Sequence, residues 1–414
     1  MAVSYRPRLV DGLMARRVRH HPAVLLVGPR ATGKTTTAAR FARSAIRLDE
    51  RAQAVAVEAD PDAALRGLAE PILVDEWQIV PEVLGAIKRT VDQDPRPGRF
   101  IVTGSVRGDV DSPTWPGTGR LIRIAMYGLS VAEIDGVIPP VPLLDRLAEY
   151  GCDALVALPD SSLDLRDYAA KAIEGGFPDP VLRLPAGERV PWLESYVEQL
   201  LTRDLAAAGA HRDPQLMRRY LEAYVLNTAG VADQRTLHEA AGVARATGQA
   251  YAKLLQSLFV VDELPAWWTN RIKRMTRGPK RYITDPALAT AVLRIDLPGL
   301  MRDGDLLERI IETFAVAQLR TQLASCESRP RLHHLRQEGG QHEVDVIVEY
   351  GGGRIFALEI KARNAPGRRD ARHLLWLRDQ LGDRFIGGAV LHSGPRTFMI
   401  DERVAAAPLA ATWS

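Results

Sequence analysis

Residues 23–37 read Ala-Val-Leu-Leu-Val-Gly-Pro-Arg-Ala-Thr-Gly-Lys-Thr-Thr-Thr, and this stretch decides the fold. The apolar run from Val24 to Val27 predicts a short buried strand. The run from Gly28 to Thr35 fits the pattern G-x-x-x-x-G-K-[ST] at every position, and the residues that follow predict a helix. A strand, a glycine loop and a helix in this order are the context in which the pattern forms a phosphate-binding loop.

The loop has the chemistry needed to surround a phosphate group. Glycines at 28 and 33 allow a tight turn, so that several backbone N–H groups point at one phosphate. The helix start adds its positive dipole end, Lys34 adds a full charge, and Thr35 supplies a hydroxyl for Mg²⁺. The alternative is a glycine turn beside a chance lysine, which the flanking strand and helix disfavour. We therefore expect ATP or ADP, with Mg²⁺, to contact Gly28, Pro29, Arg30, Ala31, Thr32, Gly33, Lys34, Thr35 and Thr36.

A second apolar strand, within residues 71–78, ends in the adjacent acids Asp75 and Glu76. Adjacent carboxylates repel each other unless a cation offsets their charge. In a P-loop ATPase, the first acid holds the Mg²⁺ shell and the second polarises the attacking water. We expect Asp75 and Glu76 to have these roles, the alternative being a strand end that meets solvent.

The strand expected at 99–105 ends in hydroxyl groups. Thr103 or Ser105 could act as a sensor that hydrogen-bonds the attacking water or the γ-phosphate, and simple strand-end capping is the alternative. We select Ser105 for the sensor role. Arg120 follows a Gly/Pro-rich loop and precedes the next strand. It could reach a γ-phosphate in its own subunit or a neighbour's, or it could be a surface arginine.

Composition places the chain among globular proteins of two or three domains. It has 414 residues, 46% of them hydrophobic and 25% charged, with a net charge of +3. No apolar run approaches the roughly 20 residues that a membrane helix needs, and the amino terminus lacks a signal-like segment. Two distant cysteines, Cys152 and Cys326, suggest a reducing compartment, so we expect a cytoplasmic protein without membrane contact. The arginines within residues 1–22 are expected to form a solvated helix face, the alternative being that some approach the nucleotide base or ribose.

The chain resembles the bacterial and archaeal AAA-type ATPases whose usual partner is the carboxy-terminal domain of unknown function 4143. The resemblance rests on the phosphate loop followed by Val74-Asp75-Glu76-Trp77-Gln78, Ile101-Val102-Thr103-Gly104-Ser105, Gly119-Arg120, Leu129-Ser130 with Glu133, Gly175-Gly176-Phe177-Pro178, Ser195-Tyr196-Val197 and Arg203-Asp204-Leu205. It covers nearly the whole chain. The loop at 108–119 departs from the small-residue run of the family, which leaves the role of Arg120 open.

The middle of the chain predicts a linker and then helices. Prolines mark residues 136–165 as a linker, and residues 166–230 have a helical pattern. Arg203 and Asp204 read as a helix salt bridge, with an interface or sensor pair as the alternative.

Residues 234–284 read as helix, turn and helix followed by two strands, which is a winged-helix pattern. The segment between the strands carries cations and no acid. They are Arg271, Lys273, Arg274, Arg277, Lys280 and Arg281. Such a wing could contact DNA phosphates, although winged helices bind proteins about as readily.

The last segment, 303–414, resembles the PD-(D/E)xK nuclease core. An amphipathic helix carrying Glu308 precedes a strand with Asp345 and a second strand with Glu359 and Lys361, whose alternation puts these two side chains on one face. The resemblance implies that Asp345 and Glu359 hold a divalent metal, that Lys361 orients or activates water, and that Glu308 reaches in from the helix. One alternative is a surface hairpin, which alternates charges in the same way. Another is a nuclease-like fold without cleavage activity, because a fold does not imply a function.

Together these features predict an α/β fold: an AAA-type parallel sheet, a helical and winged-helix middle, and a restriction-endonuclease-like α/β domain. We expect the ATPase domain at 1–140, the linker and helical region at 141–230, the winged helix at 231–300 and the nuclease-like domain at 301–414. The predicted function is that of a Mg²⁺-dependent ATPase with a DNA-related or regulatory role, and a homo-oligomer is one possible assembly. The alternative is a nucleotide-switched protein-interaction module whose nuclease fold is silent.

Overall fold

The computed structural model describes residues 5–106, 119–204, 213–231, 234–268, 278–337 and 341–414. The chain forms two compact units. The first unit comprises Met1–Leu129 with Leu255–Val260, and the second comprises Ser130–Leu254 with Val261–Ser414. Among the helices of these described ranges, none is both long enough and apolar enough to cross a bilayer.

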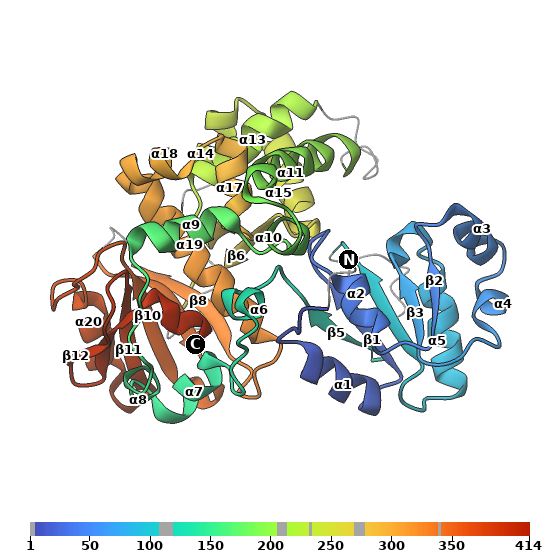
Figure 1. Ribbon diagram of the computed structural model, residues 1–414, viewed down its shortest axis with the longest axis horizontal. Helices are drawn as coiled ribbons and strands as arrows, with labels where there is room; N and C mark the ends of the chain where they lie inside the picture. The colour runs from blue at the N-terminus through green and yellow to red at the C-terminus, as the bar shows by residue number, and fades with distance from the viewer. Residues whose placement is uncertain (1–4, 107–118, 205–212, 232–233, 269–277, 338–340) are drawn as a thin grey trace. The chain divides into compact units, whose positions relative to one another are not determined.

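The first unit is built on a parallel sheet of five strands in the order β2-β3-β4-β1-β5 (Figure 1). The strands are β1 (Ala23–Val27), β2 (Ser44–Arg47), β3 (Ile72–Asp75), β4 (Phe100–Gly104) and β5 (Leu121–Ala125). Every residue of β1, β3 and β4 is buried, which explains why each reads as an unbroken apolar run instead of an alternating one. The expected α/β fold with a P-loop NTPase sheet is confirmed.

Short helices connect these strands. They are α1 (Asp11–His20), α2 (Lys34–Ala39), α3 (Arg51–Ala59), α4 (Pro61–Leu65), the 3₁₀ turn η1 (Trp77–Ile79) and α5 (Val83–Gln93). In α5, Val83, Ile87 and Val91 recur every four residues and are buried against the sheet, so the helix packs by one apolar stripe.

The first unit also contains a segment from much later in the chain. Leu255–Val260 belongs to this unit, and Phe259 is buried in its apolar core. The Phe259 ring meets Tyr127 edge-on, with 6.5 Å between the ring centroids.

The second unit begins where a linker was expected, and that expectation is wrong for residues 143–156. The chain forms α6 (Val131–Asp135), α7 (Leu143–Tyr150) and α8 (Asp153–Val156). Leu143, Leu144 and Leu147 are buried, and the Tyr350 hydroxyl donates to the Leu144 carbonyl oxygen at 2.7 Å. Pro139, Pro140 and Pro142 lie just before α7 and Pro159 follows α8, so none of them interrupts a helix.

The middle of the second unit contains helices and a two-stranded hairpin. They are α9 (Leu165–Glu174), α10 (Pro178–Leu182), α11 (Ala186–Gln199), the π-helical turn η2 (Leu200–Asp204), α13 (Pro214–Leu226), α14 (Gln234–Ala241), α15 (Arg245–Ser257), β6 (Val261–Leu264), β7 (Lys280–Ile283), α17 (Pro286–Leu293) and α18 (Leu297–Arg302). The strands β6 and β7 pair antiparallel. The sequence reasoning did not predict the helices α17 and α18.

The rest of the second unit is a mixed sheet of six strands in the order β12-β13-β11-β10-β9-β8. Its elements are α19 (Gly304–Leu323), β8 (Arg331–Arg336), β9 (Glu343–Glu349), η4 (Gly351–Gly353), β10 (Ile355–Ile360), α20 (Arg372–Leu381), η5 (Gly382–Arg384), β11 (Phe385–His392), β12 (Phe398–Asp401), β13 (Val404–Pro408) and η6 (Leu409–Trp413). The strand β10 pairs antiparallel with β9 and parallel with β11, so the predicted carboxyl-terminal α/β domain is present.

A bulge interrupts the outer strand β8. The pairing of β8 with β9 shifts register between His333 and Leu335, and His334 lies at the shift. Its backbone N–H donates to the Pro265 carbonyl at 3.1 Å, and its ring Nε2 lies 3.1 Å from the Gly278 carbonyl oxygen. Burial lowers the pKa of His334 from 6.5 to about 4, and the charge of Lys280 acts in the same direction, as do those of His333 and Arg336.

This depressed pKa predicts acid sensitivity of the second unit. The unfolded chain binds a proton at His334 below about pH 6.5 and the native chain does not, so this stability is present above that pH and is lost as pH falls toward 4. Between pH 7.5 and 5 the loss from this residue should be about 2 kcal/mol. Urea unfolding at both pH values, followed by tryptophan fluorescence, measures it. His334→Gln, which cannot titrate, should be less acid-sensitive by that amount; equal sensitivity would contradict the assignment.

Candidate functional site

The phosphate loop is shaped by a close approach between two backbone segments. A Cβ atom on Gly28 would lie 1.8 Å from the Met126 carbonyl oxygen, just after β5, so only glycine fits. Gly33 has φ of +87°, a left-handed conformation that glycine adopts readily. The loop thus passes from β1 into α2 without a side chain at either glycine, and α2 begins at Lys34.

Lys34 lies inside the loop. Its side chain is buried, and its Nζ donates to the Pro29 carbonyl oxygen at 2.6 Å. Burial lowers its pKa to about 8, while the charges of Glu76 and Asp75 act in the opposite direction. A phosphate in the loop would add negative charge beside the ammonium group and favour its charged form.

The carboxyl ends of β3 and β4 bring the predicted Mg²⁺ residues together. The Thr35 hydroxyl donates to Asp75 Oδ1 at 2.8 Å, and the Thr103 hydroxyl donates to the same oxygen. Asp75 is buried at the end of β3, and Thr103 is buried near the end of β4. Thr35 and Asp75 are therefore in direct contact. This closeness is what two residues of one Mg²⁺ coordination shell require.

Glu76 is held beside this pair in a strained turn. Its φ is +57°, which is rare for a residue with a side chain. The Ser105 hydroxyl donates to Glu76 Oε2 at 3.0 Å, and the Gln78 amide donates to the same oxygen. The backbone N–H of Glu76 donates to the Thr103 hydroxyl oxygen at 3.3 Å. The structure thus brings Glu76 and Ser105 together and adds Gln78, which the sequence reasoning quoted in a motif without assigning it a role.

Arg120 is not brought to this site in its own chain. The register pairs Ala23 with Leu121 and Val27 with Ala125, so Arg120 lies at the opposite edge of the sheet from the loop. At about 3.3 Å per residue, the two are separated by roughly 20 Å along the strand. Its Nε donates to Asp92 at 2.8 Å. The own-subunit role is therefore wrong, and a role in a neighbouring subunit stays a prediction.

Arg8 is a supporting residue that the sequence reasoning missed. It was expected on a solvated face, yet it is buried. Its guanidinium donates to the Thr32 carbonyl at 2.8 Å, and to the Tyr127 and Gly128 carbonyls at 2.8 and 3.1 Å. It thereby ties the phosphate loop to the segment after β5, and no pattern in residues 1–22 distinguishes it from the other arginines.

A second group of charges lies in the carboxyl-terminal sheet. Lys280 of β7 is buried, and its Nζ lies 2.6 Å from Glu312 Oε1 and 2.8 Å from Asp345 Oδ1. The Tyr282 hydroxyl donates to Glu312 Oε1 at 2.5 Å. Lys280 was expected as an exposed wing cation, so that expectation is wrong, and so is the one for Arg281, which is buried beside Glu263.

The predicted nuclease-like residues are partly assembled. Glu359 is buried on β10, with Lys361 Nζ 3.4 Å from its Oε2. Burial, together with the charge of Asp345, raises the pKa of Glu359 well above its usual range. Glu308 is exposed on α19, and its charge helps to raise the pKa of Lys361, after those of Asp345 and Glu359. Glu312, one turn later on the same helix, contacts Lys280. Within the described residues, no set of three or more His, Cys, Asp or Glu side chains is arranged to hold a metal ion.

Some predicted residues lie outside the described part of the chain. They are Arg271, Lys273, Arg274 and Arg277 of the expected wing, and the side chains of Arg203 and Asp204. Cys152 and Cys326 are described, and both are buried free thiols, in keeping with an inert role.

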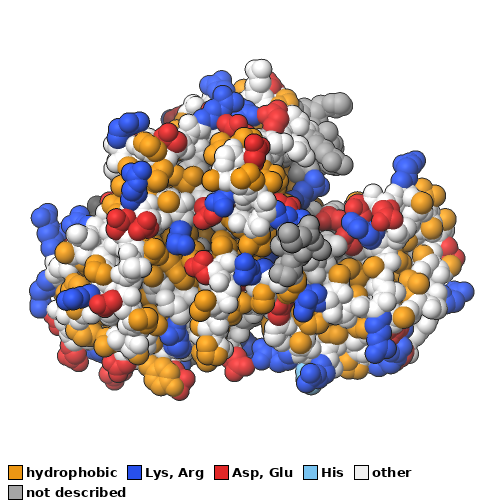
Figure 2. Space-filling view, in the orientation of Figure 1, with side chains coloured by type: hydrophobic (Ala, Val, Ile, Leu, Met, Phe, Trp, Pro, Cys, Tyr) orange, Lys and Arg blue, Asp and Glu red, His pale blue; other side chains and the backbone are white. Residues whose placement is uncertain are grey.

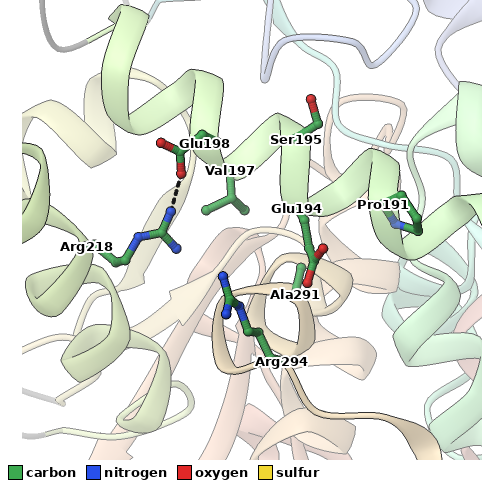
Figure 3. Close-up of a pocket in the computed structure, with 8 residues that line it drawn as sticks. All are labelled: Pro191, Glu194, Ser195, Val197, Glu198, Arg218, Ala291 and Arg294. Carbon is green, nitrogen blue, oxygen red and sulfur yellow. Dashed lines mark hydrogen bonds and ion pairs between the residues drawn. The ribbon is translucent and has the colours of Figure 1, made fainter.

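A groove of about 320 Å³ is present on helices of the second unit (Figure 3). It is lined by Pro191, Glu194, Ser195, Val197, Glu198, Arg218, Ala291 and Arg294. Arg218 and Glu198 point toward one another and form an ion pair (Figure 3). With two arginines and two glutamates the lining has no excess charge, and the sequence reasoning assigned no ligand to it.

Three stretches of the chain match known families. Residues 20–135 match a family described as AAA domain. Residues 165–298 and 307–412 match two families described as domains of unknown function, DUF8612 and DUF4143. The AAA-type segment and a carboxyl-terminal DUF4143 segment are therefore both present. The expected winged-helix stretch at 234–284 falls within the DUF8612 match and outside the DUF4143 match.

Similar whole proteins are known as well. Two uncharacterized proteins, from Mycobacterium bovis and Mycobacterium tuberculosis, are each 28% identical over 403 residues, which is 95% of this chain and 81% of theirs. Among solved structures, AMPPCP-bound DnaA from Aquifex aeolicus aligns with 60% of this chain and 86% of its own at 14% identity. Its TM-score is 0.24, which is too low to bear on function.

The close approach at Gly28 predicts the effect of adding one methyl group there. Gly28→Ala should weaken binding of ADP with Mg²⁺ at least tenfold, about 1.4 kcal/mol, because the loop must move off Met126. Calorimetric titration measures this affinity. Gly12→Ala on α1 is the matched control, since a Cβ there meets nothing within 4 Å. Equal affinities in the two variants would rule out this role for Gly28.

Proposed function

We propose that this chain binds ATP with Mg²⁺ at the phosphate loop and hydrolyses it. The observation that carries the proposal is the convergence of Lys34, Thr35, Asp75 and Glu76 at one edge of the parallel sheet, with Thr35 and Asp75 in direct contact. In that order they supply a cation for phosphate, a hydroxyl and a carboxylate for the metal, and a second acid for the attacking water. The match of residues 20–135 to an AAA domain supports the same activity.

Each residue has a distinct part in this proposal. The loop amides and Lys34 would hold the β- and γ-phosphates, and Thr35 and Asp75 would hold Mg²⁺, whose charge would offset that of the phosphates. Glu76 polarises a water molecule and accepts its proton as the oxygen attacks the γ-phosphorus. The bond to the β–γ bridging oxygen breaks, so ADP and inorganic phosphate leave. Ser105 positions the Glu76 carboxylate through the hydrogen bond that it donates.

The carboxyl-terminal unit is proposed to carry the response to nucleotide. The order α14, α15, β6 and β7 supports a winged helix within 231–300, and the β9-β10-β11 arrangement supports a nuclease-like fold within 301–414. A role on DNA would rest on cations of the wing and on arginines after β10. Of these, Arg363, Arg368 and Arg378 pair with Asp370 or Asp401.

A second candidate is therefore a nucleotide-switched module that binds protein. It is favoured by the burial of Lys280 and Arg281, which removes two of the cations expected to face phosphates. On the face of this unit seen in Figure 2, basic and acidic side chains are interspersed. Under either candidate the ATPase site and its residues are the same, and the chain acts in the cytoplasm.

The role of Glu76 is tested by removing its charge alone. Glu76→Gln should retain ATP while turnover falls on the order of 10²-fold or more, because the proton acceptor is lost. Phosphate release measures turnover, and calorimetry measures binding. Glu82→Gln, at an exposed position of the same unit, is the control. Lys34→Ala should lose binding itself, and full turnover in Glu76→Gln would remove the role given to this residue.

The role of Arg120 in a neighbouring subunit is tested by mixing two inactive variants. Arg120→Ala keeps Glu76 and Glu76→Gln keeps Arg120, so in a mixed homo-oligomer a complete site forms where the two meet. Random assembly of a symmetric ring should complete about one site in four. Turnover of the mixture should then exceed the sum of its components. A mixture no more active than that sum would exclude the shared site.

A further inference from the structure

Two buried carboxylates, Asp345 on β9 and Glu312 on α19, already accept hydrogen bonds from the chain itself. Asp345 Oδ1 accepts from Lys280 Nζ at 2.8 Å, and Asp345 Oδ2 accepts from the Ile360 backbone N–H at 2.9 Å. Glu312 Oε1 accepts from Lys280 at 2.6 Å and from the Tyr282 hydroxyl at 2.5 Å. The nuclease resemblance would have Asp345 donate electrons to a divalent metal instead.

These contacts do not fit a metal ion at the same place. A Mg²⁺ ion needs carboxylate oxygens at about 2.1 Å with room for several waters. The Lys280 ammonium already lies between Glu312 and Asp345, and a second cation there would be repelled at close range. Glu359 Oε1 is buried without a hydrogen-bond partner among the described residues. It is the one oxygen of this pair left open to a metal ion, whereas the resemblance requires both Asp345 and Glu359 as metal ligands.

Lys280 is also not free to leave. Its side chain is 2% exposed, and it belongs to β7, which is held to β6 by strand pairing. Moving the ammonium group into water would require β7 to separate from the sheet that carries Asp345. The lysine is therefore a fixed part of the cluster and not a mobile side chain that a metal could displace.

We propose that Lys280 is the resident cation of this cluster, in place of a divalent metal, and that it joins the β6–β7 hairpin to the carboxyl-terminal sheet by charge. The lysine comes from the stretch matching DUF8612, and Glu312, Asp345 and Glu359 come from the stretch matching DUF4143. The cluster thus links two sequence families within one unit. The carboxyl-terminal sheet then serves as a rigid support for the hairpin and has no metal-dependent cleavage chemistry.

Binding of Mn²⁺ to the nucleotide-free full chain tests this proposal, with electron paramagnetic resonance to separate free from bound ion. Wild type and Glu359→Gln should bind the same number of Mn²⁺ ions, since any ion held near Asp75 is common to both. The ion pairs of Lys280 are with Glu312 and Asp345, so Glu359→Gln leaves both of them in place. One fewer ion bound by Glu359→Gln would overturn the proposal.

A second variant asks whether Lys280 occupies the metal position. Lys280→Met keeps the length of the side chain and removes its charge, so the folded variant should gain one Mn²⁺ ion that Lys280→Met/Glu359→Gln lacks. Lys171→Met, on α9 of the same unit, should gain none. A folded Lys280→Met variant without the extra ion would overturn the proposal. If circular dichroism shows that the variant does not fold, the comparison of wild type with Glu359→Gln decides alone.

Discussion

The backbone at Gly28 passes the Met126 carbonyl so closely that no side chain fits between them, and the nucleotide site depends on this approach. It holds the phosphate loop against the end of β5, and Arg8 strengthens the contact from the other side with hydrogen bonds to both segments. A loop fixed in this way can keep Lys34 buried, although burial disfavours its charge. The nearby carboxylates Asp75 and Glu76 offset part of that penalty.

Much of the site could be predicted because it is encoded locally. The phosphate loop, the strand ending in Asp75-Glu76 and the strand ending in Thr103 and Ser105 are each continuous stretches, and parallel strands bring their carboxyl ends to one edge. The same rule could have placed Arg120 correctly. It precedes its strand, so it belongs at the amino edge, away from the phosphate loop.

The rest could not be read from the sequence because it depends on distant residues. Lys280 is 65 residues from Asp345 and 32 from Glu312. Its own segment is rich in cations and therefore predicts an exposed basic wing, and only the contacts with these distant carboxylates show that it is buried. The prolines near 140 predict a linker. The helix that follows them is stabilised by a hydrogen bond from Tyr350, which lies far along the chain and which the local sequence does not reveal. A buried ion group of this kind gives little net stability, because desolvation offsets the attraction, but it disfavours other arrangements of its strands.

The return of Leu255–Val260 into the first unit makes that unit discontinuous in sequence. The backbone passes between the units at three places, after Leu129, before Leu255 and after Val260, so three covalent connections join them. A fragment that stops before residue 255 would also lack the Phe259 ring and leave an aromatic-sized hole beside Tyr127. The nucleotide fold is therefore complete only once more than half of the polypeptide has been synthesised.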